Sequence, residues 1–175
     1  MSLQTIIYRV RQFIDASLAR VSLEHLREAE EILPLKAQEL FRRMGVPDQK
    51  HALNVMRTLR HDGCTEPDLM AAALLHDVGK SATRIYSWHR AIIVLSKHLT
   101  PRLLARLIGG EPRGWRRPFV IHDQHAGIGA EWAAQAGCSA LTVSLIRRHQ
   151  EPLNRAPLDQ EERLLVSLQR ADSAN

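Results

Sequence analysis

The residues best suited to do chemistry are His76 and Asp77, which directly follow an apolar run from Leu69 to Leu75. A helix that is apolar on every side is buried in the middle of a bundle. Ionisable side chains at its end then need a partner that neutralises or hydrogen-bonds them, and a bound cation would do so. The alternative for this pair alone is a helix C-cap followed by a surface aspartate.

Other ligand-type side chains extend the apolar faces of separate segments. These residues are His51, His125, His149 and Asp172. His149, for example, follows Leu145 at i+4 spacing, so both lie on one helix face. A lone histidine in such a place is more often a core residue than a ligand, and the argument therefore depends on several of them together. His122, three residues before His125, remains an alternative to it.

Taken as a set, these side chains predict a metal site with the ligands His51, His76, Asp77, His125, His149 and Asp172. Imidazole and carboxylate donors suit divalent transition metals such as Mn, Fe, Zn, Ni or Co. More than four such ligands favour two metal ions that share an aspartate and an activated water. Asp77 is the natural bridge, and we expect one or two ions.

Basic residues near these ligands could hold an anionic substrate. Lys80 follows the His-Asp pair by one turn, and Arg147 and Arg148 precede His149. Ammonium and guanidinium groups bind phosphate oxygens and stabilise charge that develops on them. A cationic helix end and solvated arginines are the plainer alternatives. The loop 109–118 carries three more arginines and could form a lid. His25, His61, His89 and His98 are expected at the surface.

The elements that position these residues are all helical by pattern. Glycine and proline separate segments of helical length, and no segment alternates like a strand. The expected helices cover residues 49–60, 69–75, 88–99, 125–136, 139–149 and 159–172, with two or three more in the first 44 residues. Thr65 and Ser139 are the expected N-caps. The first 44 residues should pack on a metal-binding core over 45–175, as one compact domain.

Composition bounds the remaining possibilities. The 175 residues are 45% hydrophobic, which suffices for one core without disulfides, and the two cysteines lack the spacing of a zinc or redox motif. Without an apolar stretch long enough to span a membrane, we expect a cytoplasmic protein. The net charge of +5 suits a small phosphorylated substrate, while the absence of aromatic-basic alternation argues against nucleic acid as a partner. The oligomeric state is left open.

The order of these motifs resembles the HD-domain superfamily of metal-dependent phosphohydrolases. His51, the run Leu74-Leu75-His76-Asp77-Val78-Gly79-Lys80, which is similar to the HDIG form, and Ala171-Asp172 carry the resemblance. It implies an all-α fold, ligation by His51, His76, Asp77 and Asp172, and Lys80 near the scissile phosphate. The segments 125–131 and 146–151 resemble motifs of the two-metal HD-GYP subgroup, which adds His125 and His149. No Gly-Tyr-Pro follows Glu151.

The expected function is hydrolysis of a phosphate ester by metal-activated water, with Asp77 and Lys80 as catalytic residues. The resemblance favours a nucleotide or a related phosphomonoester or phosphodiester as the substrate. Three other interpretations remain open. The first is a regulatory module that binds a nucleotide at a retained metal site without turnover, and the second is a di-iron oxygenase on the same fold. The third is a plain helical bundle whose histidines are coincidental.

Overall fold

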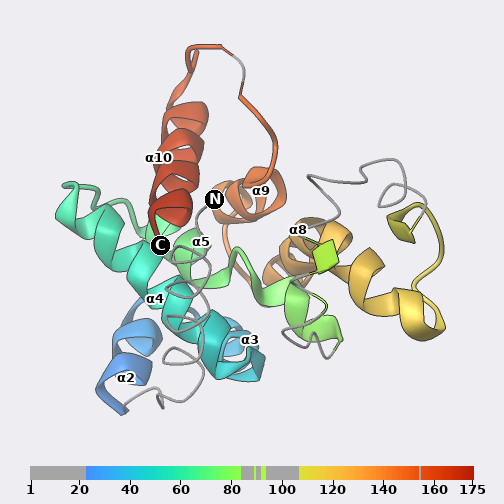
Figure 1. Cartoon of the computed structure of the whole chain (residues 1–175). Coiled ribbons are helices and arrows are strands. Elements are labelled where there is room, and N and C mark those ends of the chain that lie inside the picture. Colours follow the sequence, from blue (N-terminus) through green and yellow to red (C-terminus); the bar gives the residue numbers. More distant parts are fainter. Residues whose placement is uncertain (1–22, 84–88, 90–91, 94–106, 154) are drawn as a thin grey trace, which may run out of the picture.

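The computed structural model describes residues 23–83, 89, 92–93, 107–153 and 155–175, and within these ranges the regular elements are all helical (Figure 1). The expectation of an all-α bundle is confirmed. In chain order the elements are α2 (Leu23–Ile32), α3 (Leu35–Arg43), α4 (Val46–His61), α5 (Pro67–Leu75), the 3₁₀ helices η1 (Val78–Ala82) and η2 (Gly114–Arg116), α8 (Arg117–Gln135), α9 (Ala140–Arg148) and α10 (Gln160–Ala174).

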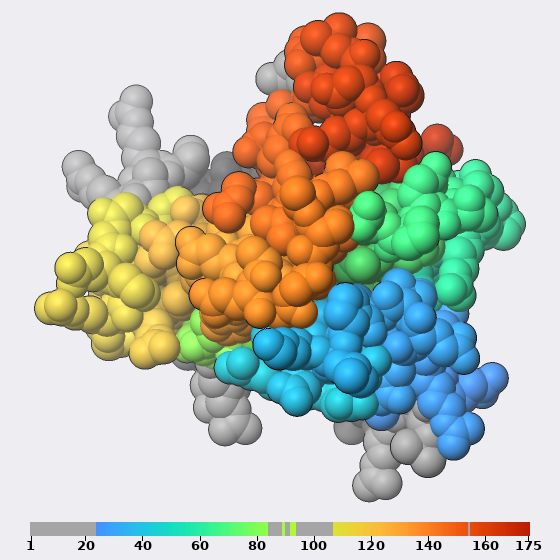
Figure 2. Space-filling view, turned by 180° about the vertical axis from the view of Figure 1, so that it is seen from behind, coloured from blue at the N-terminus to red at the C-terminus, as the bar shows by residue number. Residues whose placement is uncertain are grey.

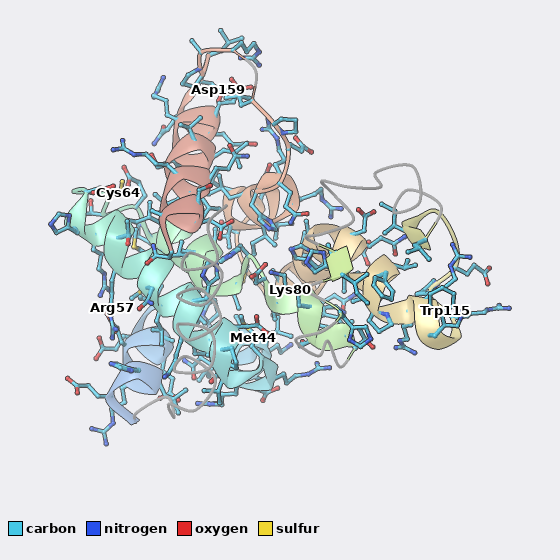
Figure 3. All side chains as sticks on the ribbon, viewed as in Figure 1. Met44, Arg57, Cys64, Lys80, Trp115 and Asp159 are labelled. Atoms are coloured by element: carbon cyan, nitrogen blue, oxygen red, sulfur yellow. The ribbon has the colours of Figure 1, made fainter. Side chains whose placement is uncertain are left out.

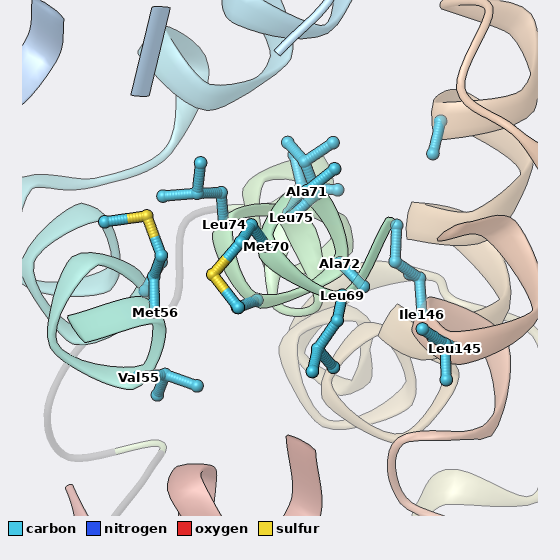
Figure 4. Close-up of a cluster of buried hydrophobic side chains, with 14 of the residues drawn as sticks. Val55, Met56, Leu69, Met70, Ala71, Ala72, Leu74, Leu75, Leu145 and Ile146 are labelled. Atoms are coloured by element: carbon cyan, nitrogen blue, oxygen red, sulfur yellow. The ribbon is translucent and has the colours of Figure 1, made fainter. Parts of the chain in front are cut away.

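Helix α5 lies at the centre of the bundle, as its apolar sequence predicts. Each residue from Leu69 to Leu75 is buried, and the helix contacts α2, α3, α4, α9 and α10. Figure 4 shows its side chains between Val55 and Met56 of α4 on one side and Leu145 and Ile146 of α9 on the other. Because other helices surround α5, the residues that directly follow it, His76 and Asp77, lie in the interior of the protein.

Helix α4 has the amphipathic face that the sequence indicates. Ala52, Val55, Met56 and Leu59 are all buried in the core cluster. The helix begins at Val46, three residues earlier than expected, because Pro47 occupies its first turn, where a proline's missing N–H costs no hydrogen bond. The early start places His51 well inside a formed helix.

Helix α8 also begins earlier than the sequence pattern suggested, at Arg117 and not near His125. Pro118 lies in its first turn, so this proline opens a helix where we expected it to close a loop. Before it, Gly114–Arg116 form a single 3₁₀ turn. The predicted excursion over 109–118 is therefore shorter than expected, and its last residues belong to helices.

Two helices, α9 and α10, begin at an N-cap residue whose side chain accepts a backbone N–H. Ser139 accepts the Thr142 backbone N–H at 3.0 Å, which confirms it as the cap of α9, and Asp159 accepts the Glu162 N–H at 2.8 Å at the start of α10. The prediction of Thr65 as the cap of α5 is wrong, since Glu66 is the N-cap residue. Pro67 already takes the first helical position, and the residue before a proline is held extended.

The N-terminal helices share the core of the rest of the protein. Ala29, Leu33, Ala37 and Phe41 are buried in the same cluster as α4 and α5. In the space-filling view from behind, α3 lies below the orange region that includes α9, α2 lies beside it at the lower right, and α10 rises at the top (Figure 2). Of the helix expected over 88–99, only His89, Ile92 and Ile93 are described, each of them helical. Expectations for residues 1–22 lie outside the described residues.

The structure bears on the two cysteines and on whether a helix could cross a membrane. Cys64 and Cys138 are both free thiols, partly buried against the core, as expected. Among the helices that the structure describes, none combines the length and apolar character that crossing a bilayer requires.

Candidate metal centre

Six side chains with metal-binding atoms converge inside the bundle, and they are the six that the sequence predicted. They form two adjoining triads, His51–His76–Asp172 and Asp77–His125–His149. Within each triad the candidate ligand atoms all lie within 4.8 Å of one another. The first triad joins α4, the C-cap of α5 and α10, and the second joins Asp77, two residues after α5, to α8 and the C-cap of α9. These buried His and Asp groups could hold a metal ion.

Asp77 lies between the two triads. Its Oδ1 is 3.1 Å from Nε2 of His125 and 4.0 Å from Nε2 of His149, while its Oδ2 is 3.6 Å from Nε2 of His76. His76 Nε2 is in turn 3.5 Å from Asp172 Oδ1. The consecutive residues His76 and Asp77 thus contact both triads, which is the placement expected of a bridging carboxylate.

The orientations of His76 and His149 follow from their positions at helix ends. Each is the C-cap residue of its helix, α5 and α9 respectively. Carbonyl groups in the last turn of a helix lack intrahelical partners. The Nδ1 of His76 therefore donates to the Ala73 carbonyl at 2.9 Å, and that of His149 donates to the Ile146 carbonyl at 2.7 Å. Both rings then direct Nε2 towards Asp77.

His125 is held in the same manner from the middle of α8. Its Nδ1 donates to the His122 carbonyl at 2.5 Å, and its ring is fully buried. His125, not His122, belongs to the triad, which decides the alternative that the sequence left open; His122 contributes through its backbone. A backbone acceptor on Nδ1 fixes the proton there and leaves the Nε2 lone pair for a metal, as second-shell contacts commonly do.

A contact between Gly79 and Gly129 brings α8 close enough to η1 for the ring of His125 to reach Asp77. A Cβ at Gly79 would lie 2.0 Å from the His125 carbonyl oxygen and 2.9 Å from the Gly129 amide nitrogen. Position 79 therefore has no room for a side chain. Gly79 lies inside η1 and is not among the described glycines with positive φ, so no turn requires a glycine there. Its role is the close approach of two backbones.

Two buried histidine nitrogens in the site face carboxylate oxygens and could hold a cation together with them. Nε2 of His76 and Nε2 of His125 are buried and have no hydrogen-bond partner. With their protons on Nδ1, both nitrogens present lone pairs to carboxylate oxygens only 3.1–3.6 Å away. Two acceptors at such distances repel unless a proton or metal lies between them. Ligand atoms on a tetrahedral zinc are roughly 3.4 Å apart, so the spacing suits a metal.

The charge state of the centre follows from burial and pairing. Burial would raise the pKa of Asp77, but His76 and Lys80 outweigh it and hold that pKa well below its ordinary value. Burial likewise opposes ionisation of Asp172, whose pKa is nevertheless lowered because the rings of His51 and His76 lie 2.8 Å and 3.5 Å from its Oδ1. Despite its burial, His76 has a raised pKa because both aspartates are close. Burial and the charge of His76 lower the pKa of His149 to about 4.

Lys80 reaches the centre, as the sequence suggested. Its Nζ donates to Asp77 Oδ2 at 2.5 Å, and its side chain is partly buried. Figure 3 labels Lys80 where η1 passes α8. The 3₁₀ turn that begins after Asp77 explains the contact, because it returns the residue three positions later to the same side. A cation on the chain is thus already paired with the central carboxylate.

The arginines proposed for substrate binding lie in other surroundings. Arg148 is engaged by Glu161 at 2.6 Å and Glu151 at 3.1 Å, which ties α9 to α10, and these carboxylates raise its pKa. Arg147 is exposed. No contact described for either residue reaches the two triads. Their role in substrate binding stays a prediction.

The loop arginines make local contacts. Arg113 pairs with Glu111, Arg116 donates to the Leu107 carbonyl at 2.9 Å, and Arg117 donates to the Ala82 carbonyl at 3.3 Å. Trp115 is 70% exposed and labelled at the edge of the bundle in Figure 3. The described part of this segment therefore does not cover the metal centre, and a lid function stays a prediction.

One histidine and one glycine lie elsewhere than the sequence predicted. His89, expected at the surface, is buried, because its ring packs against Phe119 of α8, with the ring centroids 5.5 Å apart. His61 is exposed as expected. Gly129 was not identified as part of the site. Its spacing of four residues from His125, on the same helix face, was the available indication.

No protein-family model, curated protein or solved structure matches this chain significantly.

Proposed function

We propose that this protein is a metal-dependent phosphohydrolase of the HD-domain kind, which uses its two triads to activate water against a phosphate ester. The observation that carries the proposal is the pair of buried, unpartnered Nε2 atoms of His76 and His125 around the carboxylate of Asp77. Such an arrangement is costly in a metal-free core and is satisfied by a divalent cation. The order of these residues along the chain also resembles that of the HD-domain superfamily.

Each residue has a role that its position supports. His51, His76 and Asp172 would hold one ion, His125 and His149 a second, and Asp77 would serve both. The low pKa of Asp77 and the pKa of about 4 at His149 keep these groups in their metal-binding forms at neutral pH. A divalent metal, when bound, lowers the pKa of water and neutralises charge on a phosphoryl group.

Besides the metal ions, the protein itself would supply a positive charge through the ammonium of Lys80. Its ammonium is 2.5 Å from Asp77 Oδ2, and its side chain is 17% exposed. With the carboxylate of Asp77 engaged by metal, the ammonium of Lys80 would turn to a phosphate oxygen and stabilise the charge that develops during hydrolysis. Mn, Fe, Zn, Ni and Co all accept imidazole and carboxylate ligands, and the HD-domain resemblance favours a nucleotide as the substrate.

The proposal is tested with protein purified without chelators or an affinity metal. Elemental analysis should give one or two transition metal ions per chain, and the protein should hydrolyse a generic aryl phosphate ester. The Asp77→Asn variant should lose activity and most of the metal. Asp62→Asn is the matched control, because Asp62 is an exposed residue after α4 whose loss leaves both triads intact.

The outcomes separate the alternatives. Metal without turnover on any phosphate ester would favour a regulatory nucleotide-binding module, and consumption of oxygen by an iron-loaded protein would favour a di-iron oxygenase. A protein that binds none of the supplied metals would remove the central premise of the proposal.

A further inference from the structure

A surface pocket of about 400 Å³ lies beside the first triad and has no role in the proposed chemistry so far. Its wall includes His51, one of the candidate metal ligands, together with Lys50, Asn54 and Arg57 from the same helix, α4. His25 and Asn175 complete its polar lining. A pocket of this size accommodates a small organic molecule or part of one. We name it the Lys50 pocket.

Cations and amides line the Lys50 pocket, and the acids that pair with its residues, Glu28 on Arg57 and Asp172 on His51, lie outside the lining. Lys50, Asn54 and Arg57 are spaced at i, i+4 and i+7, so they lie along one face of α4. Among the residues that the structure describes, no carboxylate side chain lines the pocket. A concave surface with this lining attracts anions and repels cations.

Hydrogen-bond donors in the pocket have capacity to spare. Neither the ammonium of Lys50 nor the side-chain amide of Asn54 has a hydrogen-bond or ion-pair partner among the described residues. Arg57 uses only its Nη2, on Glu28 at 2.7 Å, which leaves its Nε and Nη1 hydrogens available. Figure 3 labels Arg57 where α4 runs alongside α2. Three side chains can thus donate to one ligand.

The position of His51 connects the pocket to the metal centre. His51 lines the pocket and its Nε2 also contacts Asp172 Oδ1 at 2.8 Å within the first triad. A molecule seated in the pocket is therefore adjacent to the ion that this triad would hold. Since Lys50 directly precedes His51, a ligand can contact the ammonium and remain within reach of the centre.

We propose that the Lys50 pocket binds a second phosphate group of the substrate whose ester is cleaved at the metal centre. This inference rests on the proposed function and makes it more specific, since it selects phosphate esters that carry another phosphate over those that carry one. Lysine and arginine donors, reinforced by an amide, are the groups with which proteins bind phosphate oxygens. Lys50 and Arg57 are then specificity-determining residues, not catalytic ones.

The test compares two nucleotides that differ by one phosphate, adenosine 5′-monophosphate and adenosine 3′,5′-bisphosphate. Calorimetric titration of the full-length protein as purified gives the Kd of each, and turnover adds a continuous heat that is separable from binding. Wild type should bind the bisphosphate at least roughly tenfold more tightly, since a charge-assisted hydrogen bond contributes a factor of this order. Lys50→Gln should reduce this preference, and Lys50→Glu should reduce it further because it reverses the charge.

Lys36→Glu is the matched control, because Lys36 is an exposed lysine on α3 outside the pocket lining. It should retain the full preference, and thermal unfolding of each variant verifies folding. Equal affinity for the two nucleotides, binding of neither, or an equal effect of Lys36→Glu overturns the inference. A Lys50-dependent preference without any hydrolysis would instead retain the phosphate pocket and refute the proposed function.

Discussion

Gly79 lies against the backbone of His125 so closely that a Cβ at position 79 would be 2.0 Å from the His125 carbonyl oxygen. The contact sets the separation between η1 and α8, and with it the 3.1 Å distance from His125 Nε2 to Asp77 Oδ1. The second triad therefore depends on the absence of a side chain two residues after Asp77.

Replacing Gly79 by alanine should lower both stability and metal content. The added methyl group overlaps backbone atoms that cannot rotate away, and overpacking of this kind costs about 1–3 kcal/mol or more. Denaturant unfolding and elemental analysis measure the two effects. Gly127→Ala on α8 is the control, since a Cβ there meets no atom within 4 Å and alanine stabilises a helix by about 0.5–1 kcal/mol. Equal behaviour of the two variants would contradict the role of Gly79.

Metal affinity should rise with pH in the range just above 6.5. The raised pKa of His76 means that a proton must leave this ring before it can ligate, whereas His149, with a pKa of about 4, is already neutral. Calorimetric metal titrations in two buffers of different ionisation enthalpy measure the proton release. An affinity that stays constant across this range, with no proton released, would show that His76 is not a ligand.

The stability of the metal-free protein should show the opposite trend. The pKa of His76 is higher in the folded state than its ordinary 6.5, so the stabilisation from its proton is fully present below pH 6.5 and is lost as the pH rises through the folded-state value. Unfolding with chelator present should thus become easier above pH 6.5, and added metal should reverse the trend. His125→Ala, which leaves His76 in place, should keep the pH trend and lose only the part of the metal effect that depends on the second triad.

Lys80→Gln should separate substrate stabilisation from metal binding. Glutamine retains most of the side-chain length but removes the charge that faces Asp77 at 2.5 Å. We expect kcat for an aryl phosphate ester to fall roughly 10²- to 10³-fold with metal content preserved, as for loss of one preorganised donor. Lys36→Gln serves as the control. Full activity in Lys80→Gln would show that Lys80 has no role in hydrolysis and is only a cation at a helix end.

Ser139→Ala should destabilise the protein by about 1 kcal/mol. The Ser139 hydroxyl accepts the Thr142 N–H at 3.0 Å and donates to Asp68 Oδ1 at 2.5 Å, so it caps α9 and ties it to the start of α5. Chemical denaturation measures the change. Ser167→Ala on α10 is the comparison, because that exposed hydroxyl only bonds the carbonyl four residues earlier. A smaller loss at Ser139 than at Ser167 would contradict the capping role.

Much of the fold was predictable because its elements have strong local patterns. The apolar run from Leu69 to Leu75 predicted a central helix, and Ser139 predicted the start of α9. The starts of α4 and α8 were misplaced because Pro47 and Pro118 were interpreted as breaks, although a proline fits a first helical turn. Whether a proline ends a loop or opens a helix depends on the residues packed around it, which a local pattern does not contain.

The sequence by itself determined which side chains could meet. Helical periodicity places His51, His149 and Asp172 on core-facing stripes, and inward-facing polar groups must find partners. Only the tertiary structure decided how they meet. The division into two triads, the choice of His125 over His122 and the close contact at Gly79 depend on the packing of α8 against η1, across more than 40 residues of chain. Such contacts are set by helix packing in three dimensions, which no local spacing encodes.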